Sequence, residues 1–223
     1  MAKDKISIGA RKFSVWPSQQ AIQERGSSSI QSTRFEDCGH FHPRLIDWLL
    51  QQEGKENKSA YFFRGACGTK IRDVHRWPVP EARLLQARAE RLFRRVTGLE
   101  TVYTDSSWAN IYRSGDYCMP HSHLRAAASI VYMLDPGDPQ PEDPHAGQFC
   151  IVDPRVGCCC QEEDERMTTP FTPAMSPGTM LIFPAQIVHS VNPYNGRRPR
   201  LTLAWNLNDR PIAGLQPWEE ASD

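Results

Sequence analysis

Hydrophobic positions change their spacing along the chain. In residues 80–96 apolar side chains recur at steps of three and four, which predicts an amphipathic helix. A shorter apolar stripe in residues 45–50 predicts a second helix. Residues 18–36 and 55–78 are polar and broken by turn residues, so we expect loops there, with a short strand near residues 61–63. The first hundred residues are therefore predicted to be rich in helix.

Beyond Gly98 the pattern changes to short alternating or continuously apolar runs separated by turn residues. Such spacing predicts antiparallel strands in a double sheet or barrel. The expected strands lie at residues 107–113, 128–134, 148–152, 179–183, 188–191 and 200–206. With the helices ahead of them, these strands predict an α+β, mainly β protein, a jelly roll buttressed by N-terminal helices. We expect one domain over residues 1–223, with support from 1–100, a core at 101–210 and a tail at 211–223.

Charge and composition narrow the possible partners. The chain has 223 residues, with 26 basic and 26 acidic side chains, so its formal net charge is zero. A neutral chain lacks the broad positive field that favours nucleic acid, and no polybasic segment suits a membrane surface. The first residues lack a secretory apolar stretch, and no run approaches the ~18 apolar residues that cross a bilayer. We therefore expect a cytoplasmic protein with a small-molecule or peptide substrate, and the sequence leaves its oligomeric state open.

Cysteines and long loops have several interpretations. The seven cysteines, an odd number, argue for reduced thiols rather than a disulfide framework. Adjacent residues rarely chelate one ion, so surface or lid positions are a better interpretation of Cys158, Cys159 and Cys160 than a zinc site. These residues belong to the insertion at 154–177, which is either a substrate-covering segment or a disordered loop. The acidic, proline-rich residues 135–144 should form an exposed loop.

Two other groups of polar residues have mainly structural interpretations. Arginines, Arg88 among them, interrupt the apolar stripe of residues 80–96. They could bind an acidic partner, but the overall neutrality favours a solvated helix face. His40 and His42 are separated by one residue, yet no Arg-x-Thr run follows them. We interpret this pair as residues of a loop or a helix start rather than as metal ligands.

The strongest chemical signal follows the first predicted strand of the core, where two histidines are separated by one residue. If His121 and His123 lie on extended chain, both imidazoles point the same way, because side chains at i and i+2 share a face. Neutral imidazole nitrogens suit iron, copper, nickel or zinc, and His189 is the best third donor. A lone histidine on an apolar strand is more often a core residue, but three in this order predict a shared metal site.

Arg200 opens an alternating run after His189. Arg200 and Thr202 would share a face of that strand, and a guanidinium beside a hydroxyl is a good receptor for a carboxylate. The alternative for Arg200 is a surface salt bridge, with Arg197 and Arg198 as competitors for the anion. The sequence thus predicts a site for a metal ion and an anion.

These motifs, taken in order, resemble the 2-oxoglutarate/iron(II)-dependent oxygenases. The likeness covers roughly residues 107–208 and is greatest to a bacterial branch of largely uncharacterised proteins related to prolyl hydroxylases. The residues that carry it are Tyr112-Arg-Ser-Gly115, His121-x-His123, Pro177-Gly-Thr-Met-Leu-Ile-Phe-Pro184, His189-Ser-Val191 and Arg200-x-Thr202. In that family the fold is the double-stranded β-helix, with iron at its open mouth.

The resemblance also implies a reaction and a set of roles. Iron(II) would be held by the three histidines, and 2-oxoglutarate would chelate it while its far carboxylate meets Arg200 and Thr202. Oxygen would be the oxidant, with succinate and carbon dioxide as co-products of the hydroxylation of a free amino acid, small metabolite or peptide. Tyr112 matches a tyrosine that lines the co-substrate pocket in the prolyl hydroxylase branch, and Asn110 shares its strand face; a packing role is the alternative for both.

One departure from the family pattern affects the chemistry. The usual motif is His-x-Asp or His-x-Glu with a distal histidine, whereas His123 occupies the carboxylate position here. Related halogenases have a small residue there that leaves room for chloride, and His123 fills that room, which favours hydroxylation. Two alternatives remain. One is a three-histidine iron dioxygenase that does not use 2-oxoglutarate, and the other is a metal-binding jelly roll without catalysis.

Overall fold

Two antiparallel sheets dominate the computed structural model, which describes residues 4–24, 30–53, 68–123, 125–138, 140–152 and 170–211. The small sheet has the order β7 (Cys118–His121), β11 (Val188–Val191), β9 (Phe149–Val152). The large sheet has the order β3 (Gln23–Glu24), β4 (Gln31–Arg34), β10 (Thr179–Pro184), β8 (Ala128–Asp135), β12 (Arg200–Asn208), β6 (Tyr103–Tyr112), β5 (Thr69–Arg72).

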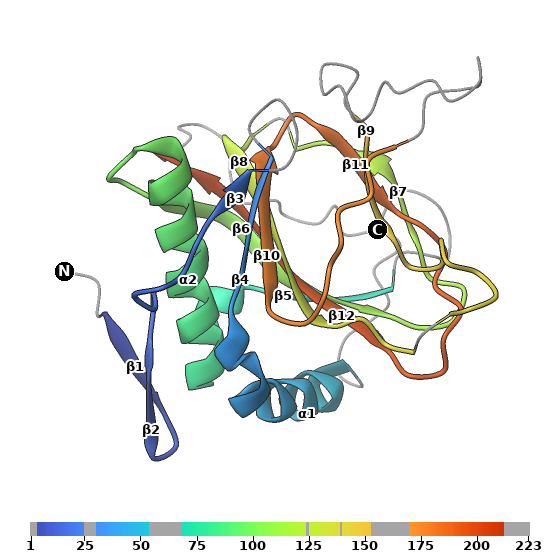
Figure 1. Ribbon diagram of the computed structural model, residues 1–223, viewed down its shortest axis with the longest axis horizontal. Helices are drawn as coiled ribbons and strands as arrows, with labels where there is room; N and C mark the ends of the chain where they lie inside the picture. The colour runs from blue at the N-terminus through green and yellow to red at the C-terminus, as the bar shows by residue number, and fades with distance from the viewer. Residues whose placement is uncertain are drawn as a thin grey trace, which may run out of the picture.

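The two sheets face each other across an apolar core. Val131 and Phe183 of the large sheet pack with Phe149, Ile151 and Val191 of the small one. Figure 1 shows the small sheet on one side of the large sheet and the two helices on the other. The arrangement is a double-stranded β-helix, so the predicted fold class is confirmed.

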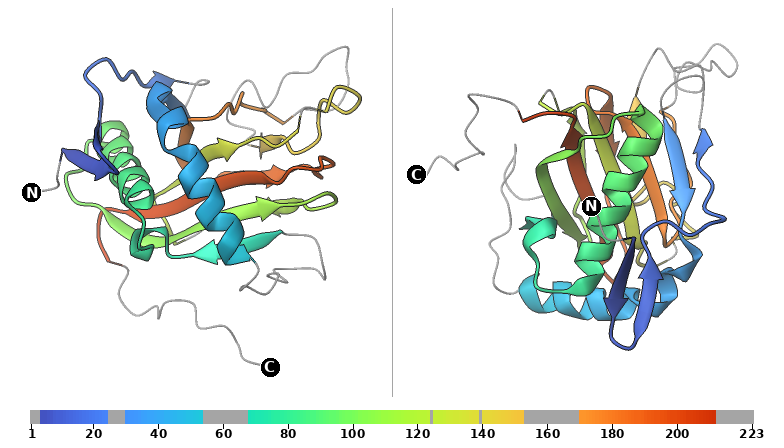
Figure 2. Two further views of the ribbon diagram at one scale, coloured as in Figure 1. Left: turned by 90° about the horizontal axis from the view of Figure 1, so that it is seen from below. Right: turned by 90° about the vertical axis from the view of Figure 1, so that its left-hand side faces the viewer.

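The helices α1 (His42–Glu53) and α2 (Pro80–Thr97) cover the outer face of the large sheet (Figure 2). Alternate residues of β8 turn to opposite sides, as period-2 patterning requires. Ile130 and Tyr132 belong to the core beneath the helices, whereas Val131 belongs to the core between the sheets. A hydrogen bond also joins the large sheet to α2, because the indole Nε1 of Trp205 on β12 donates to Gln86 Oε1 of α2 at 2.7 Å.

The N-terminal hundred residues contain more strand than predicted. A hairpin of β1 (Lys5–Ile8) and β2 (Arg11–Ser14) precedes β3 and β4, which lie in the segment expected to be a loop. β4 pairs with β10 and β5 pairs with β6, so both extend the large sheet. Short 3-10 turns cover Glu36–His40 and Val74–Arg76. The strand expected near residues 61–63 lies outside the described residues.

The arginines of α2 were predicted to form a solvated helix face, and for Arg88 this prediction is wrong. Its side chain is fully buried, with the guanidinium carbon 4.2 Å from the centroid of the Phe35 ring. Both terminal nitrogens donate to Asp37, at 2.9 and 2.5 Å, and Nη2 also donates to the carbonyl of Ser14 at 3.1 Å. A buried cation needs such a paired partner, and Asp37 comes from a distant segment.

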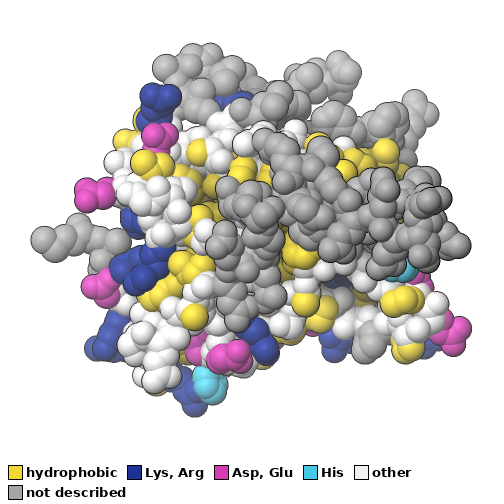
Figure 3. Space-filling view, turned by 45° about the horizontal axis from the view of Figure 1, so that its top comes forward, with side chains coloured by type: hydrophobic (Ala, Val, Ile, Leu, Met, Phe, Trp, Pro, Cys, Tyr) yellow, Lys and Arg dark blue, Asp and Glu magenta, His cyan; other side chains and the backbone are white. Residues whose placement is uncertain are grey.

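Surface features agree with a neutral chain. On the described part of the face in Figure 3, basic and acidic side chains are interspersed rather than gathered in patches of one sign. Cys38, Cys118 and Cys150, the cysteines within the described residues, are free thiols, whereas the Cys158–Cys160 triplet lies outside them. Across the same part of the chain, no helix combines the length and the apolar character that crossing a bilayer requires.

His42 begins α1 and makes stability depend on pH. Its ring is 5 % exposed, and Nε2 lies 2.6 Å from the Tyr132 hydroxyl. Burial, with a contribution from the Arg88 charge, lowers the pKa of His42 from 6.5 to about 4. The unfolded chain therefore takes up a proton first as pH falls. The stability conferred by the neutral ring is complete above pH ~6.5 and lost towards pH ~4, up to about 3 kcal/mol in all.

Urea unfolding at several pH values between 7.5 and 4.5 tests this prediction. The free energy of unfolding should fall more steeply with acidity in the wild type than in His42→Gln. The exposed neighbour His40 offers a matched control, and His40→Gln should follow the wild type. Equal slopes for His42→Gln and the wild type would show that His42 does not titrate as described.

Candidate metal centre

Three imidazoles predicted to share a metal site converge at one end of the space between the sheets. His121 ends β7 and His189 lies opposite it on β11 as its direct cross-strand partner. His123 follows β7, and its backbone N–H donates to the carbonyl of Ala185 at 2.8 Å. One potential ligand atom from each ring lies within 4.8 Å of the other two, and the ring centroids are 4.3 to 5.2 Å apart. The structure thus brings together all three histidines.

Two of these rings have a carbonyl partner for their second nitrogen. Nδ1 of His121 lies 2.8 Å from the carbonyl oxygen of Met119, and Nδ1 of His189 lies 3.0 Å from that of Ile187. A carbonyl can only accept, so Nδ1 carries the proton in each ring and the lone pair resides on Nε2. Such outer partners fix the tautomer and orientation of a metal-binding histidine. Both carbonyls lie two residues before their histidine, a spacing that the sequence analysis did not use.

All three rings are neutral near pH 7. Burial lowers the pKa of His123 and of His189 to about 3, and it lowers that of His121 as well. The positive charge of Lys70 contributes in the same direction to each. A metal ion requires deprotonated donors, so three neutral imidazoles suit a divalent iron, nickel, copper or zinc ion. The donor chemistry therefore fits a metal centre, although none of the donors is a carboxylate.

A cavity adjoins the histidines, and the predicted anion receptor lines it. Arg200 pairs with Tyr112 across β12 and β6, and Thr202 pairs with Asn110, so all four side chains reach the same cavity. The sequence analysis had placed these four residues together, and the structure does so too.

Arg200 carries a charge that the described protein residues leave uncompensated. Its side chain is 2 % exposed, and Nη1 is buried without a hydrogen-bond partner among the described residues. Burial lowers the pKa of the guanidinium, whose central carbon lies 5.5 Å from the Tyr112 ring centroid. A buried cation without a partner is costly. The geometry is that of a receptor for an anion.

Neighbouring polar groups prepare this receptor. Asn110 Nδ2 donates to the Thr202 hydroxyl oxygen at 3.3 Å, which leaves the hydroxyl hydrogen available for a ligand. Gly147 has a φ of 65°, and a Cβ on it would lie 3.1 Å from Arg200 Cδ and 3.0 Å from the Tyr194 ring. Glycine therefore lets the loop before β9 approach the guanidinium closely.

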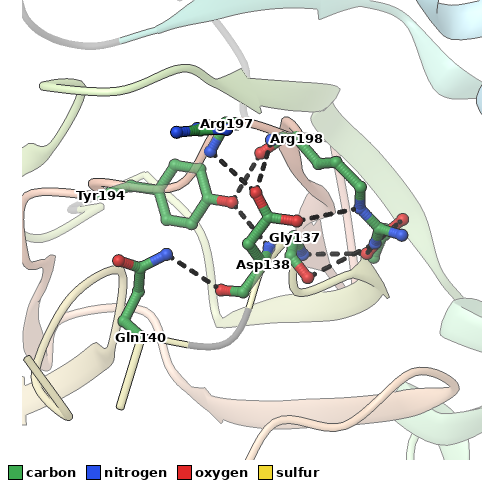
Figure 4. Close-up of polar contacts among 7 residues, drawn as sticks. Gly137, Asp138, Gln140, Tyr194, Arg197 and Arg198 are labelled. Atoms are coloured by element: carbon green, nitrogen blue, oxygen red, sulfur yellow. Dashed lines mark hydrogen bonds and ion pairs between the residues drawn. The ribbon is translucent and has the colours of Figure 1, made fainter. Parts of the chain in front are cut away.

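Arg197 and Arg198 were the alternatives to Arg200 as the anion-binding residue, and both instead contact the loop that contains Asp138 (Figure 4). Asp138 Oδ2 accepts both of their backbone N–H groups at 2.8 Å, and the Arg198 side chain pairs with Asp135 at 2.9 Å. The Tyr194 hydroxyl accepts from the backbone of Asp138. The Arg198 side chain is 61 % exposed, so this is a surface salt bridge that fixes the loop predicted at 135–144.

Other predicted or overlooked residues complete the description. His40 is exposed and His42 bonds to Tyr132, so among the described residues neither belongs to the metal cluster. Lys70 and Trp108 line the cavity beside the histidines, and the sequence analysis assigned neither of them a role. The alternation of Thr69-Lys-Ile-Arg72 places Lys70 and Arg72 on one face of a short strand, but it does not indicate that this face adjoins the cavity.

Sequence comparison shows that the core of the chain is similar to one family of oxygenases. Residues 106–206 match the sequence profile of a family described as "Putative 2OG-Fe(II) oxygenase". The matched region includes the three histidines and Arg200. No curated protein sequence matches the chain.

Several solved structures share the fold. HygX from Streptomyces hygroscopicus, solved with nickel and 2-oxoglutarate bound, is 13 % identical, with a TM-score of 0.60 over 86 % of each chain. AviO1 from Streptomyces viridochromogenes is also 13 % identical, with a TM-score of 0.57 over 85 % of this chain and 92 % of that one. A Pseudomonas putida prolyl-4-hydroxylase is 18 % identical, with a TM-score of 0.53 over 81 % and 92 %. At such identities the likeness establishes the fold.

Proposed function

We propose that this chain is a 2-oxoglutarate/iron(II)-dependent oxygenase that hydroxylates a free amino acid, small metabolite or peptide. The match of residues 106–206 to an oxygenase family supports this proposal. Succinate and carbon dioxide would be the co-products. The observation that carries this proposal is that Nη1 of Arg200 is buried without a hydrogen-bond partner among the described residues, in the cavity that the three histidines also line. A metal site beside a buried anion receptor is what a metal ion and a dicarboxylate together require.

In this proposal His121, His123 and His189 hold iron(II), which when bound supplies the redox chemistry of oxygen activation. Arg200 and Thr202 bind the far carboxylate of 2-oxoglutarate. The guanidinium does so through charge-assisted hydrogen bonds, and the hydroxyl donates the hydrogen that Asn110 leaves available. Tyr112 forms the wall against which the Arg200 guanidinium rests. The protein thus positions the co-substrate at one end of the cavity.

The carbonyls of Met119 and Ile187 have a positioning role. By accepting from Nδ1 they keep His121 and His189 in the tautomer that presents Nε2 to the ion. Apolar residues beside the site, among them Phe149 and Val191, help to exclude water from the cavity. HygX, which has the same fold, was solved with nickel and 2-oxoglutarate bound. That co-occurrence in a protein of this fold supports the assignment of both ligands to this cavity.

An anaerobic titration tests the proposal. The iron(II)-loaded protein should develop a visible charge-transfer band on addition of 2-oxoglutarate, and it should form succinate once oxygen is admitted. Absence of both would overturn the proposal. Substrate-dependent oxygen uptake without 2-oxoglutarate would then indicate a three-histidine iron dioxygenase, whereas metal binding without any turnover would indicate a binding protein.

A further inference from the structure

A row of polar side chains crosses the large sheet where it lines the cavity of the three histidines. Asn206 of β12 is buried, and its direct cross-strand partners are Ser129 on β8 and Ser106 on β6. Asn206 and Ser129 both line the cavity. Asparagine is depleted in strands, so its place in the interior of a central strand is an exception. We call Ser106, Asn206 and Ser129 the polar row.

Hydrogen bonds within the polar row use half of the Asn206 carboxamide. Ser129 Oγ donates to Asn206 Oδ1 at 2.8 Å, and Asn206 Nδ2 donates to Ser106 Oγ at 3.1 Å. A carboxamide has two hydrogens to donate and two lone pairs that accept. One hydrogen and one lone pair of Asn206 thus remain without a partner among the described residues. Because buried polar groups are normally hydrogen-bonded, a ligand with both a donor and an acceptor is favoured here.

Neighbouring groups fix the orientation of that carboxamide. The Ser106 hydroxyl lies 3.5 Å from Asp105 Oδ2, and a carboxylate only accepts, so the hydroxyl donates there and its oxygen accepts from Asn206. Asp105 is in turn paired with Arg125 at 3.4 Å. The register of β6 against β12 skips Asp105, and such β-bulges are frequent beside active sites. Asn206 therefore has a set orientation before any ligand binds.

The polar row lies at the histidine end of β12, away from the anion receptor. Phe183 of β10 is the cross-strand partner of Ser129, and its ring centroid lies 4.9 Å from that of His189. Arg200, at the other end of β12, is about 20 Å from Asn206 at the usual rise of a strand. A 2-oxoglutarate held by Arg200 would come near Asn206 only with the end that chelates the metal. The polar row is therefore placed to contact the primary substrate, whose reacting carbon must come next to the metal.

On the basis of the function proposed above, we propose that Asn206 binds an amide of the primary substrate. The group it recognises presents an N–H and a carbonyl oxygen side by side, as a residue of an extended peptide or a primary carboxamide does. The carbonyl accepts from Asn206 Nδ2 and the N–H donates to Oδ1, which matches what the polar row leaves unused. No member of the row carries a charge, so a neutral group suits it better than an acid or an ammonium. Asn206 is thus a specificity-determining residue.

Matched amides and esters, bound to the nickel-loaded protein saturated with 2-oxoglutarate, test this inference by ligand-observed NMR. The peptide probe is N-acetylalanine methylamide, beside the analogue in which an ester oxygen replaces the alanine N–H. The carboxamide probe is butyramide, beside methyl butyrate. The wild type should bind the amide of one pair about tenfold more tightly than its ester, because the ester leaves Asn206 Oδ1 unpaired. Preference within the first pair identifies a peptide substrate, and preference within the second identifies a small carboxamide.

Two alanine variants on β12 locate the preference. Asn206→Ala should abolish it, whereas Asn208→Ala should retain it. Asn208 is a matched control, because its carboxamide bonds to the backbone of Ala127 and Arg125 and it is not among the described residues that line the cavity. If Asn206→Ala did not fold, the nearly isosteric Asn206→Leu would replace it. Equal binding of amide and ester by the wild type, or a preference that persists without Asn206, would overturn the inference.

Calorimetry separates this inference from the proposed function. Asn206→Ala should keep the wild-type affinity for nickel and for 2-oxoglutarate. Loss of 2-oxoglutarate affinity in that variant would assign Asn206 to the co-substrate and overturn the inference. If the wild type bound no 2-oxoglutarate, the proposed function would fail, and the comparison of amides with esters in protein loaded with nickel alone would still decide the role of Asn206.

Discussion

Replacing His189 with alanine should weaken binding of iron(II) or nickel(II) by at least about 100-fold, since even outer-shell partners of metal ligands are worth 10- to 100-fold. His189 is the buried member of the three, and it faces His121 directly across the small sheet. Among the described residues, the three histidines are the potential ligands that converge on one point, and Cys118, which also lines the cavity, is not part of that cluster. The expected result is therefore loss of the site rather than its rearrangement.

Calorimetry with nickel(II) measures this affinity without any turnover. The exposed His145 supplies the control, because His145→Ala removes a histidine that lies outside the cluster and should bind nickel as the wild type does. Circular dichroism of the metal-free proteins would separate a lost site from a lost fold. Retained nickel affinity in a folded His189→Ala protein would contradict the metal centre described here.

Arg200→Met should raise the dissociation constant of 2-oxoglutarate by about 30-fold or more, since losing one partner of a buried charge pair costs about 2–5 kcal/mol. Metal affinity should stay largely unchanged, because Arg200 is not one of the three residues that form the metal-binding cluster. Arg200→Lys should give an intermediate value, since an ammonium lacks the planar pair of donors.

The matched control for this prediction is Arg198→Met. It removes an identical charge two residues away, but that side chain is exposed and its partners are Asp135 and Asp138. Its affinity for 2-oxoglutarate should equal that of the wild type. If Arg200→Met and Arg198→Met bound 2-oxoglutarate equally well, the receptor would lie elsewhere in the cavity.

Periodicity predicted the parts of the fold whose side chains are sorted by burial. The apolar stripe of α2 is buried against the large sheet, so its spacing is visible in the sequence. Both faces of β12 are buried, but leucines of the core beneath the helices alternate with residues that line the cavity, so this alternation is visible as well. The strand β4 was not predicted, because its sequence Gln31-Ser-Thr-Arg34 is polar and typical of a loop. It belongs to the sheet through backbone hydrogen bonds to β10, which do not depend on side-chain type.

The convergence of the three histidines and the shared cavity of Arg200 and Thr202 were predictable in part from strand parity, which aligns residues two apart. Parity holds for Arg200 and Thr202 on β12, whereas His123 follows the end of β7 and its N–H is bound by the carbonyl of Ala185. Lys70 was not predictable, since its approach to Trp108 depends on the pairing of β5 with β6. The carbonyls of Met119 and Ile187 leave no residue-specific signal, because every residue has one. Burial of Arg88 likewise depends on Asp37, which only the folded chain brings near.

The small sheet consists of three four-residue strands, far shorter than the strands at the centre of the large sheet. Two of the candidate metal ligands, His121 and His189, face each other across its β7–β11 pair, next to a register irregularity between His189 and Val191. A metal ion bound by both strands would stabilise their pairing at the point where the backbone hydrogen bonds are irregular. Loading with metal would then slow amide exchange in β7 and β11 while leaving exchange in β8 and β12 unchanged, so the candidate metal site would also stabilise the small sheet.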